Sequence, residues 1–126
     1  PRTLQNIKKF KIKLNKNIIV TNPLDFFSFV KLEMNAFCVL TDSGTVQEEC
    51  AIFKIPNIIL RDKTERPETI ESGSSIVCMN SINDILNSIK FSTQNDLIAD
   101  DVDGYHDTNV SKKVLNIILS NYEFDK

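Results

Sequence analysis

The ten residues Leu40-Thr41-Asp42-Ser43-Gly44-Thr45-Val46-Gln47-Glu48-Glu49 decide the fold. The apolar run 37–41 is typical of a buried strand, the small polar residues after it form a turn, and a helix is expected over 45–53. Pro56 ends that helix before a second apolar run at 57–60. This pattern predicts a strand–turn–helix–strand unit, the building block of a parallel sheet covered by helices.

The same alternation continues on both sides of this unit. We expect about four strands in one open parallel α/β sheet with flanking helices, and no linker divides residues 1–126 into two domains. The other strands are expected at 17–21 and 75–79. Helices are expected at 2–10, after the capping residue Asp25, and at 65–71, 82–91 and 110–121, with a loop over 92–109.

Composition and charge exclude several classes of partner. Lys plus Arg total 15 and Asp plus Glu total 17, so a net charge of −2 creates no field that attracts nucleic acid or an anionic membrane. The lysines between residues 8 and 16 are interpreted as a solvated face. The apolar runs are too short to span a bilayer and no signal pattern opens the chain, so a cytoplasmic location is expected. The three cysteines, Cys38, Cys50 and Cys78, are expected to be reduced thiols in the core.

The turn before the helix carries the residues best suited to bind an anion. Backbone N–H groups at the start of a helix lack helical partners, and the helix dipole adds partial positive charge there. The Ser43 and Thr45 hydroxyls are further donors, so a phosphate fits this place. The turn is neither a Walker loop nor the three-glycine dinucleotide fingerprint, so it does not support ATP or nicotinamide chemistry.

The two acids in the helix, Glu48 and Glu49, differ in what they can reach. Helical neighbours are turned about 100° apart, so both cannot face one ligand. Glu49 lies five residues after Gly44, a rise of roughly 7–8 Å, which is about the distance from a diphosphate to its ribose. The alternative is that Ser43 only caps the helix and the acids only complement its dipole, and the residues alone leave both interpretations open.

Two sequence blocks resemble the signature of UDP-N-acetylglucosamine 2-epimerases. They are residues 42–49, followed by Ile55-Pro56, and the run Arg61-Asp62-Lys63-Thr64-Glu65-Arg66-Pro67-Glu68. Pro1-Arg2-Thr3 and Asn109-Val110-Ser111 extend the similarity over nearly the whole chain. The resemblance implies a Rossmann-like C-terminal half, spanning 1–126, of a two-domain GT-B enzyme in which the second domain holds UDP.

Site residues are carried over from the resemblance. It implies that Ser43 and Gly44 contact the diphosphate, that Glu49 holds the ribose and that Phe29, which otherwise fits a plain helix core, lies against the uracil. Thr45 stands where most members have a second glycine, which resembles the branch that makes N-acetyl-fucosamine-type sugar nucleotides for capsules. Arg61 and Arg66 pair either a phosphate or a neighbouring carboxylate.

The resemblance also implies the reaction and the partners. The family removes the proton at C2 of the sugar, eliminates UDP and adds both back on the opposite face, without a cofactor or a metal. The catalytic groups are expected outside this chain, which alone is expected to bind a UDP-sugar without turnover, and His106 is interpreted as a surface residue. The full-length enzyme is expected to be a homodimer and the isolated chain a monomer. Two alternatives stand beside this hypothesis: a hydrolysing relative, and a non-catalytic interaction module.

Overall fold

A three-stranded parallel sheet forms the centre of the computed structural model, which describes residues 2–78, 81–94 and 100–120. Its strands are β1 (Val39–Thr41), β2 (Asn57–Ile59) and β3 (Ser75–Val77), in the order β1-β2-β3. Ile58 pairs with Leu40 on one side and with Ile76 on the other. The fold class predicted from the sequence, an open parallel sheet with flanking helices, is confirmed.

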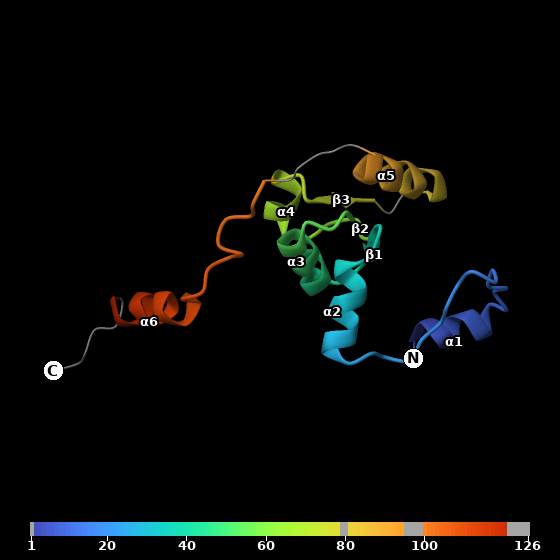
Figure 1. Ribbon diagram of the computed structural model, residues 1–126, viewed down its shortest axis with the longest axis horizontal. Coiled ribbons are helices and arrows are strands. Elements are labelled where there is room, and N and C mark those ends of the chain that lie inside the picture. The colour runs from blue at the N-terminus through green and yellow to red at the C-terminus, as the bar shows by residue number, and fades with distance from the viewer. Residues whose placement is uncertain (1, 79–80, 95–99, 121–126) are drawn as a thin grey trace.

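The core lies around the middle strand. All three residues of β2 are buried, as expected of a short apolar run in a parallel sheet that is covered on both faces. Helix α3 (Gly44–Phe53) packs against β1 and β2, and α5 (Ile82–Gln94) packs against β2. Figure 1 shows these two helices on opposite sides of the sheet. Helix α4 (Pro67–Glu71) lies between β2 and β3 in the chain.

Local signals fix where two of the helices begin and end. Helix α2 (Phe26–Met34) starts at the predicted cap, where the Asp25 carboxylate accepts hydrogen bonds from the Ser28 N–H at 3.1 Å and from its hydroxyl at 2.6 Å. Helix α3 ends at Lys54, which takes up a left-handed conformation with φ of 56°. Both ends lie within one residue of the positions that the sequence indicates.

The strand predicted at 17–21 is wrong. In this structure residues 18–25 are irregular, and Ile18, Ile19 and Val20 are 52 %, 86 % and 48 % exposed. An apolar run becomes a strand only when a neighbouring strand accepts its backbone hydrogen bonds, and within the described residues β1 pairs with β2 and not with this segment. The described residues therefore hold three strands of the four expected.

The end of α5 also differs from the expectation. Helix α5 continues past 91 to Gln94, and in this last turn the hydroxyls of Ser92 and Thr93 donate to the carbonyl of Ile89. The expected loop therefore begins later, and within it residues 100–109 are irregular. The ends predicted at 79 and 121 lie outside the described residues.

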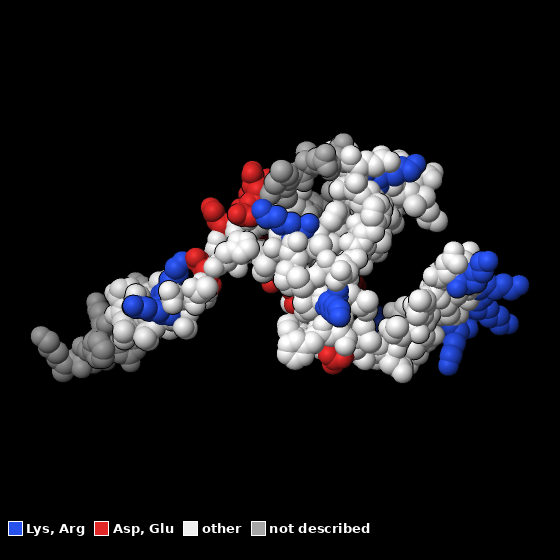
Figure 2. All heavy atoms as spheres, viewed as in Figure 1, with Lys and Arg blue, Asp and Glu red and all other residues white. Residues whose placement is uncertain are grey.

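The first and last helices extend away from the sheet. Helix α1 (Arg2–Lys9) and helix α6 (Val110–Ser120) contain no buried residue, and they stand at opposite sides of the molecule in Figure 1. The lysines around the end of α1 are exposed, as the solvated-face interpretation predicts, and form the blue cluster in Figure 2. Within the described part of the chain, no helix is long and apolar enough to cross a membrane.

Candidate functional site

The start of α3 lies directly after the carboxyl end of β1. Ser43 has an extended backbone, and its side chain makes no capping hydrogen bond. The first helical bond runs from the Gln47 N–H to the Ser43 carbonyl at 3.1 Å. The N–H groups of residues 44–46 therefore point beyond the helix end. The structure contradicts the interpretation of Ser43 as a side-chain cap and leaves its hydroxyl beside these N–H groups.

Arg66 comes from the second signature block and lies beside this turn. A Cβ atom added at Gly44 would lie 3.7 Å from both Cζ and Nη2 of Arg66. A guanidinium so close to a helix start adds a full positive charge to the partial charge of the dipole. The structure thus brings four residues together in a cationic corner, which consists of Ser43, Gly44, Thr45 and Arg66.

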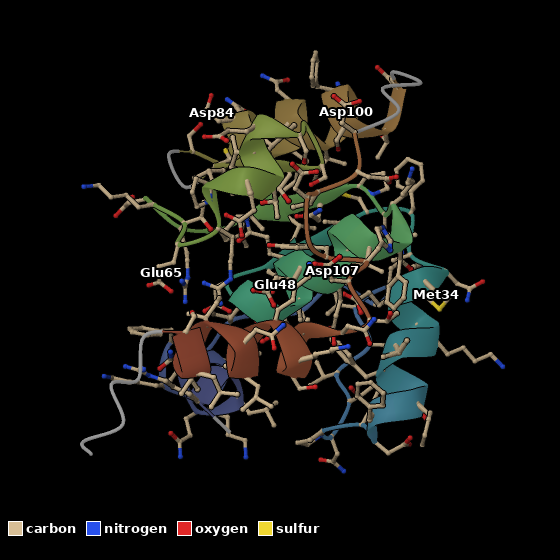
Figure 3. All side chains as sticks on the ribbon, turned by 90° about the vertical axis from the view of Figure 1, so that its left-hand side faces the viewer. Met34, Glu48, Glu65, Asp84, Asp100 and Asp107 are labelled. Atoms are coloured by element: carbon tan, nitrogen blue, oxygen red, sulfur yellow. The ribbon has the colours of Figure 1, made fainter. Side chains whose placement is uncertain are left out.

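A carboxylate holds the Arg66 side chain in this corner. Its Nε donates to Glu48 Oε1, and Nη1 donates to the Glu65 carbonyl at 3.3 Å. Figure 3 shows Glu48 on α3 and Glu65 on the neighbouring segment. The hydrogen bond with Glu48, and then its charge, raise the pKa of Arg66 above the usual value for arginine. The sequence left open whether Arg66 pairs with a phosphate or with a carboxylate. In the structure it pairs with the carboxylate of Glu48 and also lies beside Gly44.

The two acids of α3 face different neighbours, as the helical geometry predicted. Glu48 pairs with Arg66, whereas Glu49 lies near Glu33 of α2, whose pKa its charge helps to raise. Both side chains are half-buried. The structure does not bring Glu49 into contact with the cationic corner.

Arg61 and Phe29 occupy different surroundings. The Leu60 N–H donates to the Thr41 carbonyl at 2.8 Å, which sets Arg61 at the carboxyl edge of the sheet next to the turn after β1. Phe29, 40 % exposed on α2, lines an apolar pocket of about 690 Å³ together with α1 and residues 18–24. No residue of α3 lines this pocket, so Phe29 and the cationic corner do not share it.

Sequence reasoning missed the residues that connect the site to its surroundings. Gln47, only 1 % exposed, binds Thr64, Thr69 and the Arg66 carbonyl. Tyr105 donates to Glu68 Oε1 at 2.7 Å and attaches the 100–107 segment to α4. Gln47 lies one turn before Cys50 on the same face of the helix, and this spacing could have indicated that Gln47 is buried. No local pattern of residues indicates the contact that Tyr105 makes.

Several remaining expectations concern side chains outside the corner. Cys50 and Cys78 are buried, Cys38 is half-buried, and all three thiols are free, as expected of core cysteines. His106 is exposed in an irregular segment, which confirms its interpretation as a surface residue. Among the described residues, no three His, Cys, Asp or Glu side chains gather as a metal site.

The fold and the turn together define the class of protein. It is an open parallel α/β domain in which a helix begins at the carboxyl edge of the sheet, the place where such domains hold ligands. The sequence profile of the family described as UDP-N-acetylglucosamine 2-epimerase matches residues 1–119. The chain therefore belongs to this family, as its two signature blocks predicted.

Curated relatives support the same assignment. A UDP-N-acetylglucosamine 2-epimerase of Methanocaldococcus jannaschii is 51 % identical over 81 residues, which cover 61 % of this chain and 22 % of the relative. The enzyme of Methanococcus maripaludis is 34 % identical over 123 residues, covering 94 % of this chain and 33 % of the relative. The chain thus spans a third or less of the length of these relatives.

Solved structures of the family match the fold closely. The crystal structure of the Methanocaldococcus jannaschii enzyme in complex with UDP-GlcNAc and UDP aligns with a TM-score of 0.82 at 34 % identity, over 96 % of this chain and 34 % of that one. The enzyme of Rickettsia bellii gives a TM-score of 0.82 at 35 % identity, with coverages of 96 % and 34 %. The order of strands and helices is therefore that of part of an epimerase.

Proposed function

We propose that residues 1–126 are the UDP-holding C-terminal domain of a UDP-N-acetylglucosamine 2-epimerase, which inverts C2 of a UDP-sugar. One observation carries the proposal: the Arg66 guanidinium lies beside Gly44 at the exposed start of α3. Free N–H groups, two hydroxyls and a guanidinium are the donors that a diphosphate accepts from. A relative of known structure was crystallised with UDP-GlcNAc and UDP, and it aligns over almost all of this chain.

Each residue of the corner has a role in this proposal. Ser43, Thr45 and the N–H groups of 44–46 hold the diphosphate, and Arg66 neutralises its charge through Nη2, the nitrogen beside Gly44. Arg61, at the same edge of the sheet, adds a second positive charge near the turn. Glu49 accepts from the ribose hydroxyls and Phe29 stacks on the uracil. These last two roles require Glu49 and Phe29 to face the nucleotide when it binds.

The cationic corner also bears on the reaction. Elimination of UDP breaks the bond between the sugar C1 and the phosphate oxygen, and the electron pair stays on the leaving diphosphate. Fixed donors aimed at this oxygen stabilise the developing charge more than they stabilise the bound sugar nucleotide. We place the acids and bases at C2 outside this chain. The Thr45 substitution favours a sugar nucleotide for cell-surface polysaccharide, made in the cytoplasm, as the product.

Titration of the chain with UDP, by calorimetry, tests the proposal. Ser43→Ala removes one donor, a loss of about 1 kcal/mol, and should weaken UDP binding roughly fivefold. Arg66→Ala should weaken it roughly tenfold or more, because it removes a charged donor. Asp84→Ala, an exposed change on α5, serves as the control. A folded chain that binds no UDP at millimolar concentration would contradict the proposal.

A further inference from the structure

Gln47 is a buried amide with a hydrogen-bond partner at each end. Its side chain is 1 % exposed although it lies one turn from the start of α3. The carbonyl oxygen Oε1 accepts from the Thr64 hydroxyl at 2.7 Å, and Nε2 donates to Thr69 Oγ1 and to the Arg66 carbonyl, the latter at 3.3 Å. A buried amide satisfied in this way holds its partners in one arrangement.

These partners enclose the backbone of Arg66. The Arg66 N–H donates to Thr64 Oγ1 at 3.1 Å. Its carbonyl accepts from Gln47 and from both the N–H and the hydroxyl of Thr69, at 3.2 and 3.0 Å. Both backbone groups of Arg66 are therefore fixed: the carbonyl by Gln47 together with Thr69, which Gln47 also binds, and the N–H by Thr64, whose hydroxyl donates to Gln47. Arg66 is not in a helix here, since its φ of −126° and ψ of 63° fall outside the helical region.

We infer that Gln47 is a positioning residue that holds Arg66 beside Gly44 and so sets the affinity of the corner for a nucleoside diphosphate. The inference rests on the proposed function for its ligand. Gln47 itself does not touch the nucleotide, because its amide is buried beneath the 64–69 segment. The ion pair with Glu48 fixes only the side chain of Arg66. The side chains of Arg66 and Glu48 are 34 % and 33 % exposed, so solvent screens this pair.

The difference between UDP and uridine affinity measures this role. Gln47→Met keeps the length of the side chain and removes both hydrogen-bonding ends. We expect UDP binding to weaken roughly tenfold, the scale of one or two lost hydrogen bonds, while uridine binding stays unchanged. Ile58→Val, a buried change in β2, is the matched control and should leave the UDP-to-uridine ratio as in the wild type.

A double variant separates positioning from general loosening. If Gln47 acts through Arg66, then Gln47→Met combined with Arg66→Ala should bind UDP about as weakly as Arg66→Ala alone. The inference would be overturned if the loss of UDP affinity in the double variant equalled the product of the losses in the two single variants. An equal loss of UDP and uridine affinity in Gln47→Met would overturn it as well. Thr64→Val removes the hydroxyl between Gln47 and the Arg66 N–H, and it replaces Gln47→Met if that variant does not fold.

A spectrum of the ligand-free chain tests the positioning without any nucleotide. The Arg66 Nε–H donates to Glu48 in the wild type, so its NMR resonance should be shifted and protected from exchange. In Gln47→Met it should move to the position of a solvated arginine, and an unchanged resonance would refute the inference. If the wild-type chain binds no UDP, the proposed function fails, and this spectrum still decides the positioning.

Discussion

Glu33 is the most unusual residue of the core, because its carboxyl group is buried with only one oxygen bonded. The side chain is 4 % exposed, Oε1 accepts from Cys50 Sγ at 3.2 Å, and Oε2 has no partner. Burial is the main cause that raises the pKa of Glu33, the thiol hydrogen bond opposes it, and the nearby charge of Glu49 adds to it. The thiol of Cys50 is buried with it, and burial raises its pKa too.

The raised pKa of Glu33 predicts a pH dependence of stability. The folded chain holds the Glu33 proton more tightly than the unfolded chain. This contribution to stability is therefore fully present below the unfolded-state pKa and is lost as the pH rises through the folded pKa. Urea unfolding at pH 5 and pH 8 should show Glu33→Gln gaining stability relative to the wild type as the pH rises. Glu71→Gln, an exposed change on α4, should show no such gain; equal behaviour of the two variants would contradict the prediction.

At the scale of elements, the two ends of α3 differ. Its start is open to the cationic corner, and its end is closed by Lys54, whose N–H donates to the carbonyls of Cys50 and Ala51. A left-handed residue at this place is normally glycine, since a Cβ atom is strained there. Lys54 also pairs with Asp101 at 2.9 Å, and this contact ties the helix end to the 100–107 segment.

Two substitutions at Lys54 isolate the backbone strain. Lys54→Gly and Lys54→Ala both lose the ion pair with Asp101, but only glycine relieves the left-handed conformation. We expect the glycine variant to be more stable than the alanine variant by about 1 kcal/mol. Chemical unfolding of the two variants measures the difference, and equal stability would show that the helix does not end in this conformation in solution.

At the scale of the whole molecule, the sheet with α2 to α5 is the packed unit. Among the described residues, the five buried hydrophobic side chains of the core lie from residue 50 to residue 102. Helix α6 instead presents Val114, Leu115 and Ile118 to solvent at about 50 % exposure each. None of the residues of α6 is buried.

Substitutions on α6 should therefore leave the stability of the packed unit almost unchanged. Replacing Leu115 and Ile118 by glutamine should change the free energy of unfolding by no more than about 0.5 kcal/mol. Val102→Gln, a buried position at 6 % exposure, should cost at least about 1 kcal/mol, because it buries a polar group. Thermal unfolding of both variants makes the comparison, and a large loss in the α6 variant would show that this helix packs on the core.

The local features were predictable because each depends on neighbours in the chain. Asp25 caps α2 through Ser28, Pro56 follows the end of α3, and the apolar run at 57–60 contains β2. The run at 17–21 was equally apolar but is no strand here, since pairing depends on a partner that its own residues do not specify.

The sequence by itself determined the family, the parallel α/β class and the turn at 42–45, because these rest on short motifs and on periodicity. Only the tertiary structure decided which side chains meet. Arg66 reaches Glu48 across 18 residues, and Tyr105 reaches Glu68 across 37. The same structure separated Phe29 from the corner and turned Glu49 toward Glu33. The physical reason is that such contacts depend on the path of the intervening chain and on the packing of whole elements, which no local pattern of residues contains.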